Sequence, residues 1–182
     1  MSKKIDKFRL LRLFTEEPQR QYNVREAGRL AGIMPTTSSK YLKELCKDGF
    51  LTVKQERHMT LYSADTDGHA FRDFKIYSNI KKIRSSGLVE FIENSLNYPE
   101  TIILFGSYAK GENTRGSDID LFILSESRKG LDTARLEKRL GAKIQLFICG
   151  RQELENMKIK NRGLLNNIIN GIRLSGFFEV LR

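Results

Sequence analysis

The sequence has little of the material from which several classes of protein are built. Its 182 residues include only two cysteines, Cys46 and Cys149, and both lie in segments predicted to be helix or buried strand. This disfavours a disulfide framework or a zinc site. No apolar run approaches the roughly 18 residues that a membrane span requires, and the N-terminus lacks the apolar core of a signal peptide. We therefore expect a cytoplasmic protein with no membrane partner.

Acidic residues are too few to balance the basic ones. The formal net charge is +10, with 13 Lys and Arg against 8 Asp and Glu in residues 1–66, and 19 against 14 in residues 67–182. A surplus of this size favours polyanionic partners such as nucleic acid, nucleotides or an anionic surface. Because it is spread over both halves, charge alone does not locate a binding surface.

Helical periodicity organises the first third of the chain. Apolar residues at helical spacing predict a helix from residue 3 to 14, and Asn23 is placed to cap a second helix over 24–31. Gly32 would end that helix, and a third would run from Pro35 to Leu45. The stripe of the first helix consists of Ile5, Phe8, Leu11 and Phe14.

Two short strands, 50–54 and 60–64, are predicted around the polar hairpin 55–58. This order of elements, with the phrase Leu-Lys-Glu-Leu-Cys-Lys-Asp-Gly-Phe-Leu, resembles the winged helix-turn-helix domains of prokaryotic regulators. The resemblance implies contacts with double-stranded DNA from the third helix and the hairpin. Alternatively, the polar face is merely solvated or contacts protein. The candidate DNA-binding residues are Thr36, Thr37, Ser39, Lys40, Lys43 and Arg57.

A composition break at Asp65-Thr66-Asp67-Gly68 starts a segment that we interpret as a helical connector, residues 67–99. Beyond it, the β-rich apolar run 101–105 predicts a buried strand that leads into a tight turn at Gly106-Ser107. Gly106 lets the backbone approach a ligand, Ser107 supplies a hydroxyl, and the N–H groups of a following helix favour an anion. The turn is therefore a candidate phosphate site.

Two aspartates begin the next predicted strand, 117–124. Since side chains alternate along a strand, Asp118 and Asp120 share one face. Paired carboxylates repel unless a cation lies between them, and Mg²⁺ held by carboxylates and substrate phosphates fits the pattern. The alternative is a structural or capping pair.

The run Phe-Gly-Ser-Tyr-Ala-Lys-Gly followed by Ser-Asp-Ile-Asp-Leu resembles the signature of minimal nucleotidyltransferases in the DNA polymerase β superfamily. The resemblance extends to Asn167–Leu174, which would correspond to a closing helix. It implies that Asp118 and Asp120 are catalytic ligands of Mg²⁺, and that an NTP such as ATP donates an NMP to a hydroxyl. The implied nucleotide-binding and phosphate-binding residues are Gly106, Ser107, Lys110, Arg115 and Ser117. The alternative for Lys110 and Arg115 is that they are solvated loop charges.

Active members of this superfamily usually carry a third carboxylate on a later strand. Here that strand, 142–148, places Gln145 at the matching position, and glutamine is no base near neutral pH. Glu126 or Glu137 could substitute. Otherwise the protein is a transcriptional regulator whose degenerate transferase domain senses nucleotide.

The predicted fold class is therefore α+β. It comprises a winged helix-turn-helix domain (residues 1–66), the connector (67–99) and a nucleotidyltransferase domain with a mixed sheet flanked by helices (100–182). By analogy with two-gene modules, the acceptor could be a toxin partner. A homodimer is the expected assembly.

Overall fold

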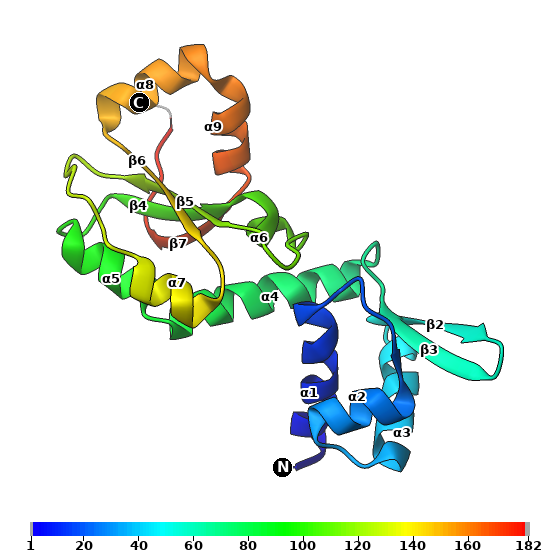
Figure 1. Ribbon diagram of the computed structural model, residues 1–182. Helices are drawn as coiled ribbons and strands as arrows, with labels where there is room; N and C mark the ends of the chain where they lie inside the picture. The colour runs from blue at the N-terminus through cyan, green and yellow to red at the C-terminus, as the bar shows by residue number, and fades with distance from the viewer. Residues whose placement is uncertain (1, 181–182) are drawn as a thin grey trace. The chain divides into compact units, whose positions relative to one another are not determined.

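The computed structural model describes residues 2–180, with side chains from residue 7 onward (Figure 1). The chain divides into two compact units, Met1–Lys75 and Ile76–Arg182. Within the described residues, no helix combines the length and the apolar character needed to cross a membrane.

The N-terminal unit combines three helices with a three-stranded antiparallel sheet of order β1-β3-β2. Asn23 caps the second helix as predicted, because its Oδ1 accepts the Glu26 N–H at 2.9 Å. Gly32 ends that helix at φ +67°. The elements are α1 (Ser2–Glu16), β1 (Tyr22–Asn23), α2 (Val24–Ala31), α3 (Pro35–Lys47), β2 (Leu51–Glu56) and β3 (Met59–Ala64).

The core of this unit lies where the helices meet the sheet. α2 and α3 approach closely at Gly28, where an added Cβ would lie 2.7 Å from the Ser38 hydroxyl. β2 and β3 are longer than predicted and leave only Arg57 and His58 in the turn. Ile5 lies outside the side chains that the structure describes. The buried members include Leu10, Leu11, Phe14, Tyr22, Leu42, Leu45 and Tyr62.

The C-terminal unit contains the expected mixed sheet flanked by helices, with strand order β6-β5-β4-β7. Only β5 and β6 are parallel; the other pairs are antiparallel. α4 runs across the division between the units. The elements are α4 (His69–Ser85), α5 (Leu88–Ser95), β4 (Thr101–Phe105), α6 (Gly106–Lys110), β5 (Ile119–Leu124), α7 (Ala134–Leu140), β6 (Ile144–Cys149), α8 (Arg151–Lys160), α9 (Arg162–Ile169) and β7 (Ile172–Gly176).

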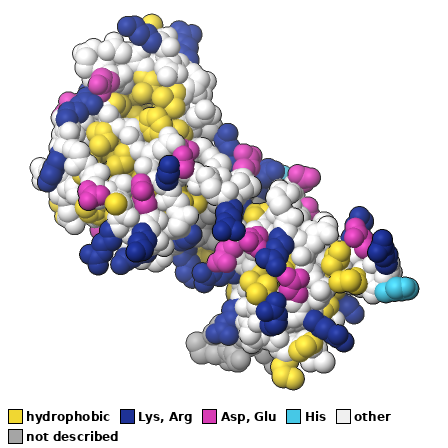
Figure 2. All heavy atoms as spheres, viewed as in Figure 1, with side chains coloured by type: hydrophobic (Ala, Val, Ile, Leu, Met, Phe, Trp, Pro, Cys, Tyr) yellow, Lys and Arg dark blue, Asp and Glu magenta, His cyan; other side chains and the backbone are white. Residues whose placement is uncertain are grey.

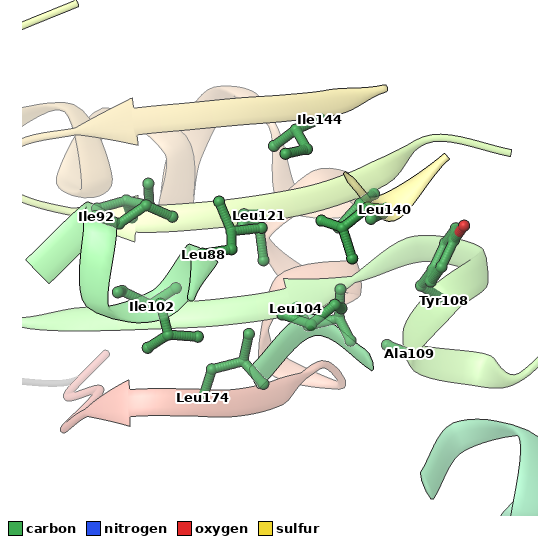
Figure 3. Packing of buried hydrophobic residues seen from close by; sticks show 14 of the residues in the cluster. Leu88, Ile92, Ile102, Leu104, Tyr108, Ala109, Leu121, Leu140, Ile144 and Leu174 are labelled. Carbon is green, nitrogen blue, oxygen red and sulfur yellow. The ribbon is translucent and has the colours of Figure 1, made fainter. Parts of the chain in front are cut away.

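Alternating side chains of β4 and β5 fill a core on each face of the sheet. One core joins Ile102, Leu104 and Leu121 to residues of α5 and α7, as Figure 3 shows from close by. The other joins Phe105 and Phe122 to residues of α8 and α9. The predicted connector contributes to the first core through Ile83, Leu88, Val89 and Ile92. The strands are therefore buried on both faces, as their unbroken apolar runs indicate.

The expected closing helix over Asn167–Leu174 is wrong. α9 ends at Ile169, and residues 172–176 form β7, which pairs with β4. Leu174 is buried whereas Arg173 is exposed, which is the alternation of a strand. Gly171 permits the change of direction, since a Cβ there would lie 2.5 Å from the Leu104 carbonyl oxygen. The segment thus completes the edge of the sheet.

Candidate active site

Gly106 brings the end of β4 against an aspartate of β5. β4 ends at Phe105, α6 begins at Gly106, and Gly106 adopts φ +69°. A Cβ at this position would overlap the Asp120 carboxylate oxygen Oδ2. Both the conformation and the space therefore require glycine here. Ser107 follows in α6 and is half-buried.

Asp120 lies in the sheet between two neighbours that belong to the same site. Its register partners are Phe105 on β4 and Gln145 on β6. Asp118 lies one residue before β5 begins. Burial, and secondarily the charge of Asp118, raise the pKa of the Asp120 carboxyl above its ordinary value. The Asp120 carboxylate is thus partly desolvated beside a second carboxylate, and a cation would relieve the repulsion between the two.

Gln145 is in contact with the aspartate pair. Its Nε2 donates a hydrogen bond to Asp118 Oδ2 at 2.6 Å, and its side chain is exposed. The amide N–H is therefore engaged by Asp118, and the amide carbonyl oxygen of Gln145 remains a neutral acceptor. The site consists of two carboxylates and one amide. No cluster of three or more His, Cys, Asp or Glu side chains suited to a metal occurs in the described part of the chain.

The other predicted phosphate-binding residues lie on or near the loop between α6 and β5. Ser117 Oγ accepts the Thr114 N–H at 2.9 Å, so this hydroxyl already closes a turn of the loop. Lys110 ends α6, Arg115 lies within the loop, and both are exposed. The Ser117 hydroxyl therefore helps to shape the loop. Lys110 and Arg115 add two long cationic side chains to the same segment.

A buried amide pair that the sequence analysis did not identify fixes this loop. Asn79 on α4 donates through Nδ2 to the Tyr108 carbonyl oxygen at 2.9 Å and to Asn113 Oδ1 at 2.7 Å. Both asparagines are buried, and burial raises the pKa of Tyr108. The sequence signal was the position of Asn79, three residues after Ile76 and four before Ile83, which places this polar residue on the apolar side of the helix. These bonds hold α6 and the following loop to α4.

Neither glutamate considered as a substitute base is free at the aspartates. Glu137 accepts the Thr133 hydroxyl and the Ile144 N–H, each at 3.1 Å, and so joins α7 to β6. Glu126 follows the far end of β5 and accepts the Arg151 N–H at 2.9 Å. At about 3.3 Å per residue, the length of β5 alone separates Glu126 from Asp120 by more than roughly 13 Å.

The candidate DNA-binding residues lie on the outer side of α3 and at the β2–β3 turn. Lys40, Lys43 and Thr36 are exposed, and Thr37 and Ser39 are half-buried. The opposite side of α3 is buried through Tyr41, Leu42 and Leu45. Arg57 occupies the exposed turn at φ +51°. Lys and Arg side chains are scattered over the visible face in Figure 2, in keeping with the even spread of charge along the sequence.

Comparison with known families agrees with this geometry for one unit. Residues 85–166 match the model of the family described as "Nucleotidyltransferase domain". The match contains the Gly106 turn, both aspartates and Gln145, and it begins before α5. A search of the curated proteins found no match. Over residues 85–166 the C-terminal unit is therefore similar to nucleotidyltransferase domains, a class of domain that supports transfer of a nucleoside monophosphate.

Proposed function

We propose that the C-terminal unit binds an NTP, with ATP as one candidate, together with Mg²⁺, and transfers its NMP to an acceptor hydroxyl. The observation that carries this proposal is the meeting of the Gly106 turn with the Asp120 carboxylate, beside Asp118. A backbone turn without a Cβ lets phosphate approach closely, and a carboxylate pair can hold the metal ion that accompanies it. Together they fit a metal-bound polyphosphate. Ser107 would donate its hydroxyl to the phosphates.

The residues present fit a magnesium ion. Mg²⁺ is commonly held by one or two carboxylates plus substrate phosphates, and Asp118 and Asp120 supply those carboxylates. Burial, and secondarily the charge of Asp118, raise the pKa of Asp120, and a bound cation would offset both effects by stabilising the carboxylate. When bound, Mg²⁺ would offset the negative charge that develops on the phosphates.

In the proposed reaction, the acceptor oxygen forms a bond to the α-phosphorus as the bond from that phosphorus to the bridging oxygen breaks. Pyrophosphate leaves and the acceptor proton must depart. Lys110 and Arg115, both exposed, would offset charge on the leaving group. Gln145 cannot take the proton, so we expect it to pass to water or to substrate, which makes the step slow.

For the N-terminal unit we propose a winged helix-turn-helix domain that binds double-stranded DNA. Support comes from the order α1-β1-α2-α3-β2-β3 and from the solvent-facing side of α3. Lys40 and Lys43 would contact phosphates, Thr36, Thr37 and Ser39 would approach base edges, and Arg57 would reach a groove or the backbone. The unit would direct the transferase or regulate expression. A toxin partner as acceptor, and a homodimer, belong to the same proposal.

One observation favours a second function. The Asp118 carboxylate accepts a hydrogen bond from Gln145. An acid at position 145 could serve as a base, whereas the amide only binds Asp118. A site of this kind could retain nucleotide without turning it over. The chain would then be a transcriptional regulator that senses nucleotide.

Incubation with labelled ATP and Mg²⁺, alone and with lysate, separates these functions. Label transferred to an acceptor by the native chain, and absent with Asp118→Asn, supports the transferase. Saturable ATP binding without transfer supports the sensor. If neither transfer nor binding is detected, both functions are wrong.

A further inference from the structure

An aromatic side chain beside the aspartates has no role in the proposed phosphate site. Phe147 lies on β6 two residues after Gln145, and 37% of its surface is exposed. A single exposed ring is ordinary on a protein surface, so the position of Phe147 beside the aspartates, and not its exposure alone, makes it a candidate for binding.

The strand register places Phe147 on the same face as the site. Alternation puts Gln145 and Phe147 on one side of β6, about 7 Å apart along the strand. Cys149, two residues further on, belongs to the core on that face. The ring of Phe147 is thus one step along the strand from the amide that contacts Asp118.

A second aromatic ring fixes the orientation of the first. Phe105 packs edge-on against Phe147, with ring centroids 5.4 Å apart and an interplanar angle of 63°. Phe105 is buried and is the register partner of Asp120. Because β5 lies between β4 and β6, the two rings meet across β5 on the face that carries Asp120. The contact forms a rigid apolar shelf beside the carboxylates.

We propose that Phe147 stacks against the base of the nucleotide whose phosphates bind at Gly106 and the aspartates. The inference rests on the proposed function and adds a base-positioning residue to it. In a nucleotide the sugar separates base from α-phosphate, and a step of two residues along β6 provides a comparable span. Stacking uses the π-face that every base has, so the shelf does not discriminate strongly between nucleotides such as ATP and GTP.

Affinity for ATP relative to inorganic tripolyphosphate, each with Mg²⁺, tests the proposal because tripolyphosphate has no base. We expect Phe147→Ala to reduce ATP affinity by on the order of 5- to 100-fold, the range for loss of one base–aromatic stack. Tripolyphosphate affinity should not change, and Phe147→Tyr should behave as the native chain. Phe177→Ala removes another exposed ring, 68% exposed and outside the site, and should leave both affinities unchanged.

The chain contains no tryptophan, so Phe147→Trp introduces a single tryptophan at the shelf, whose emission can be excited apart from that of the six tyrosines. ATP should quench its emission and tripolyphosphate should not. If both ligands bind while Phe147→Ala leaves their ratio unaltered, or ATP leaves the tryptophan emission unaltered, the stacking proposal is wrong and the phosphate site stands. If neither ligand binds the native chain, the proposed function itself fails.

Discussion

The two units place their candidate contacts in contrasting environments. In the N-terminal unit they lie on solvent-facing positions of α3 and on the β2–β3 turn. In the C-terminal unit, a glycine with no room for a Cβ meets a partly buried carboxylate. A site for a small, highly charged ligand must desolvate and orient its groups, whereas a surface for DNA needs only exposure and charge. A constrained backbone is therefore expected at the site for a small charged ligand and not at the surface for DNA.

The largest expected effect concerns position 145 of the C-terminal unit, where an amide and not an acid lies beside Asp118. Gln145→Asp would place a base beside Asp118, and we expect the rate of label transfer from ATP to rise by on the order of 10²- to 10⁴-fold. Gln145→Asn keeps an amide and is the matched control. Equal rates for the two variants would show that a base at this position does not limit the reaction.

The backbone constraint itself can be broken at Gly106. Gly106→Ala should lower ATP affinity about tenfold or more, because the new Cβ meets Asp120, and should reduce the free energy of unfolding by about 1–3 kcal/mol through its φ of +69°. Calorimetric titration and urea denaturation measure the two effects. Gly130→Ala has open space around its Cβ and should change neither quantity. ATP affinity unchanged in Gly106→Ala would contradict the assigned turn.

The contact that holds the loop between α6 and β5 should contribute less. Asn79→Ala removes the donor to the Tyr108 carbonyl oxygen, and we expect the free energy of unfolding to fall by about 1–3 kcal/mol in urea denaturation. Asn94 lies exposed on α5, so Asn94→Ala should stay within about 0.5 kcal/mol of the native value. If the two variants are equally stable, the buried amide pair is not what fixes this loop.

The smallest effect is expected on the exposed surface of the N-terminal unit. For Lys40→Ala combined with Lys43→Ala, the slope of log affinity for duplex DNA against log salt should decrease by about 1.8, or 0.9 for each lost phosphate contact. Fluorescence anisotropy over a range of salt concentrations measures it. Lys138→Ala, exposed on α7, should leave the slope unchanged. An unaltered slope in the double variant would remove α3 from the proposed DNA surface.

Local patterns in the sequence predicted the elements that local interactions determine. The helix over 24–31 and the strand over 101–105 occur as predicted, since a cap, a stop and an apolar run define them. β1 was missed because two residues show no period. β7 was expected to be helix from the resemblance over Asn167–Leu174, whereas its pairing with β4, some 70 residues away, makes it a strand.

The same division holds within the candidate site. The glycine turn and the aspartates could be identified from spacing along strands, and Gln145 from the family resemblance together with strand alternation. The bonds that link them could not: Gln145 is 27 residues from Asp118, and Asn79 is 34 residues from Asn113. Only the register of β5 against β6, and the packing of α4 on the loop, bring these groups together.

Calorimetric titration of ATP tests most directly whether the Gly106 turn and the aspartate pair form one site for a metal-bound polyphosphate. The native chain is compared with the isosteric double variant Asp118→Asn, Asp120→Asn, each with and without Mg²⁺. The account predicts saturable binding that requires Mg²⁺ and is lost in the double variant. Equal ATP binding by the two proteins, or binding indifferent to Mg²⁺, would contradict it.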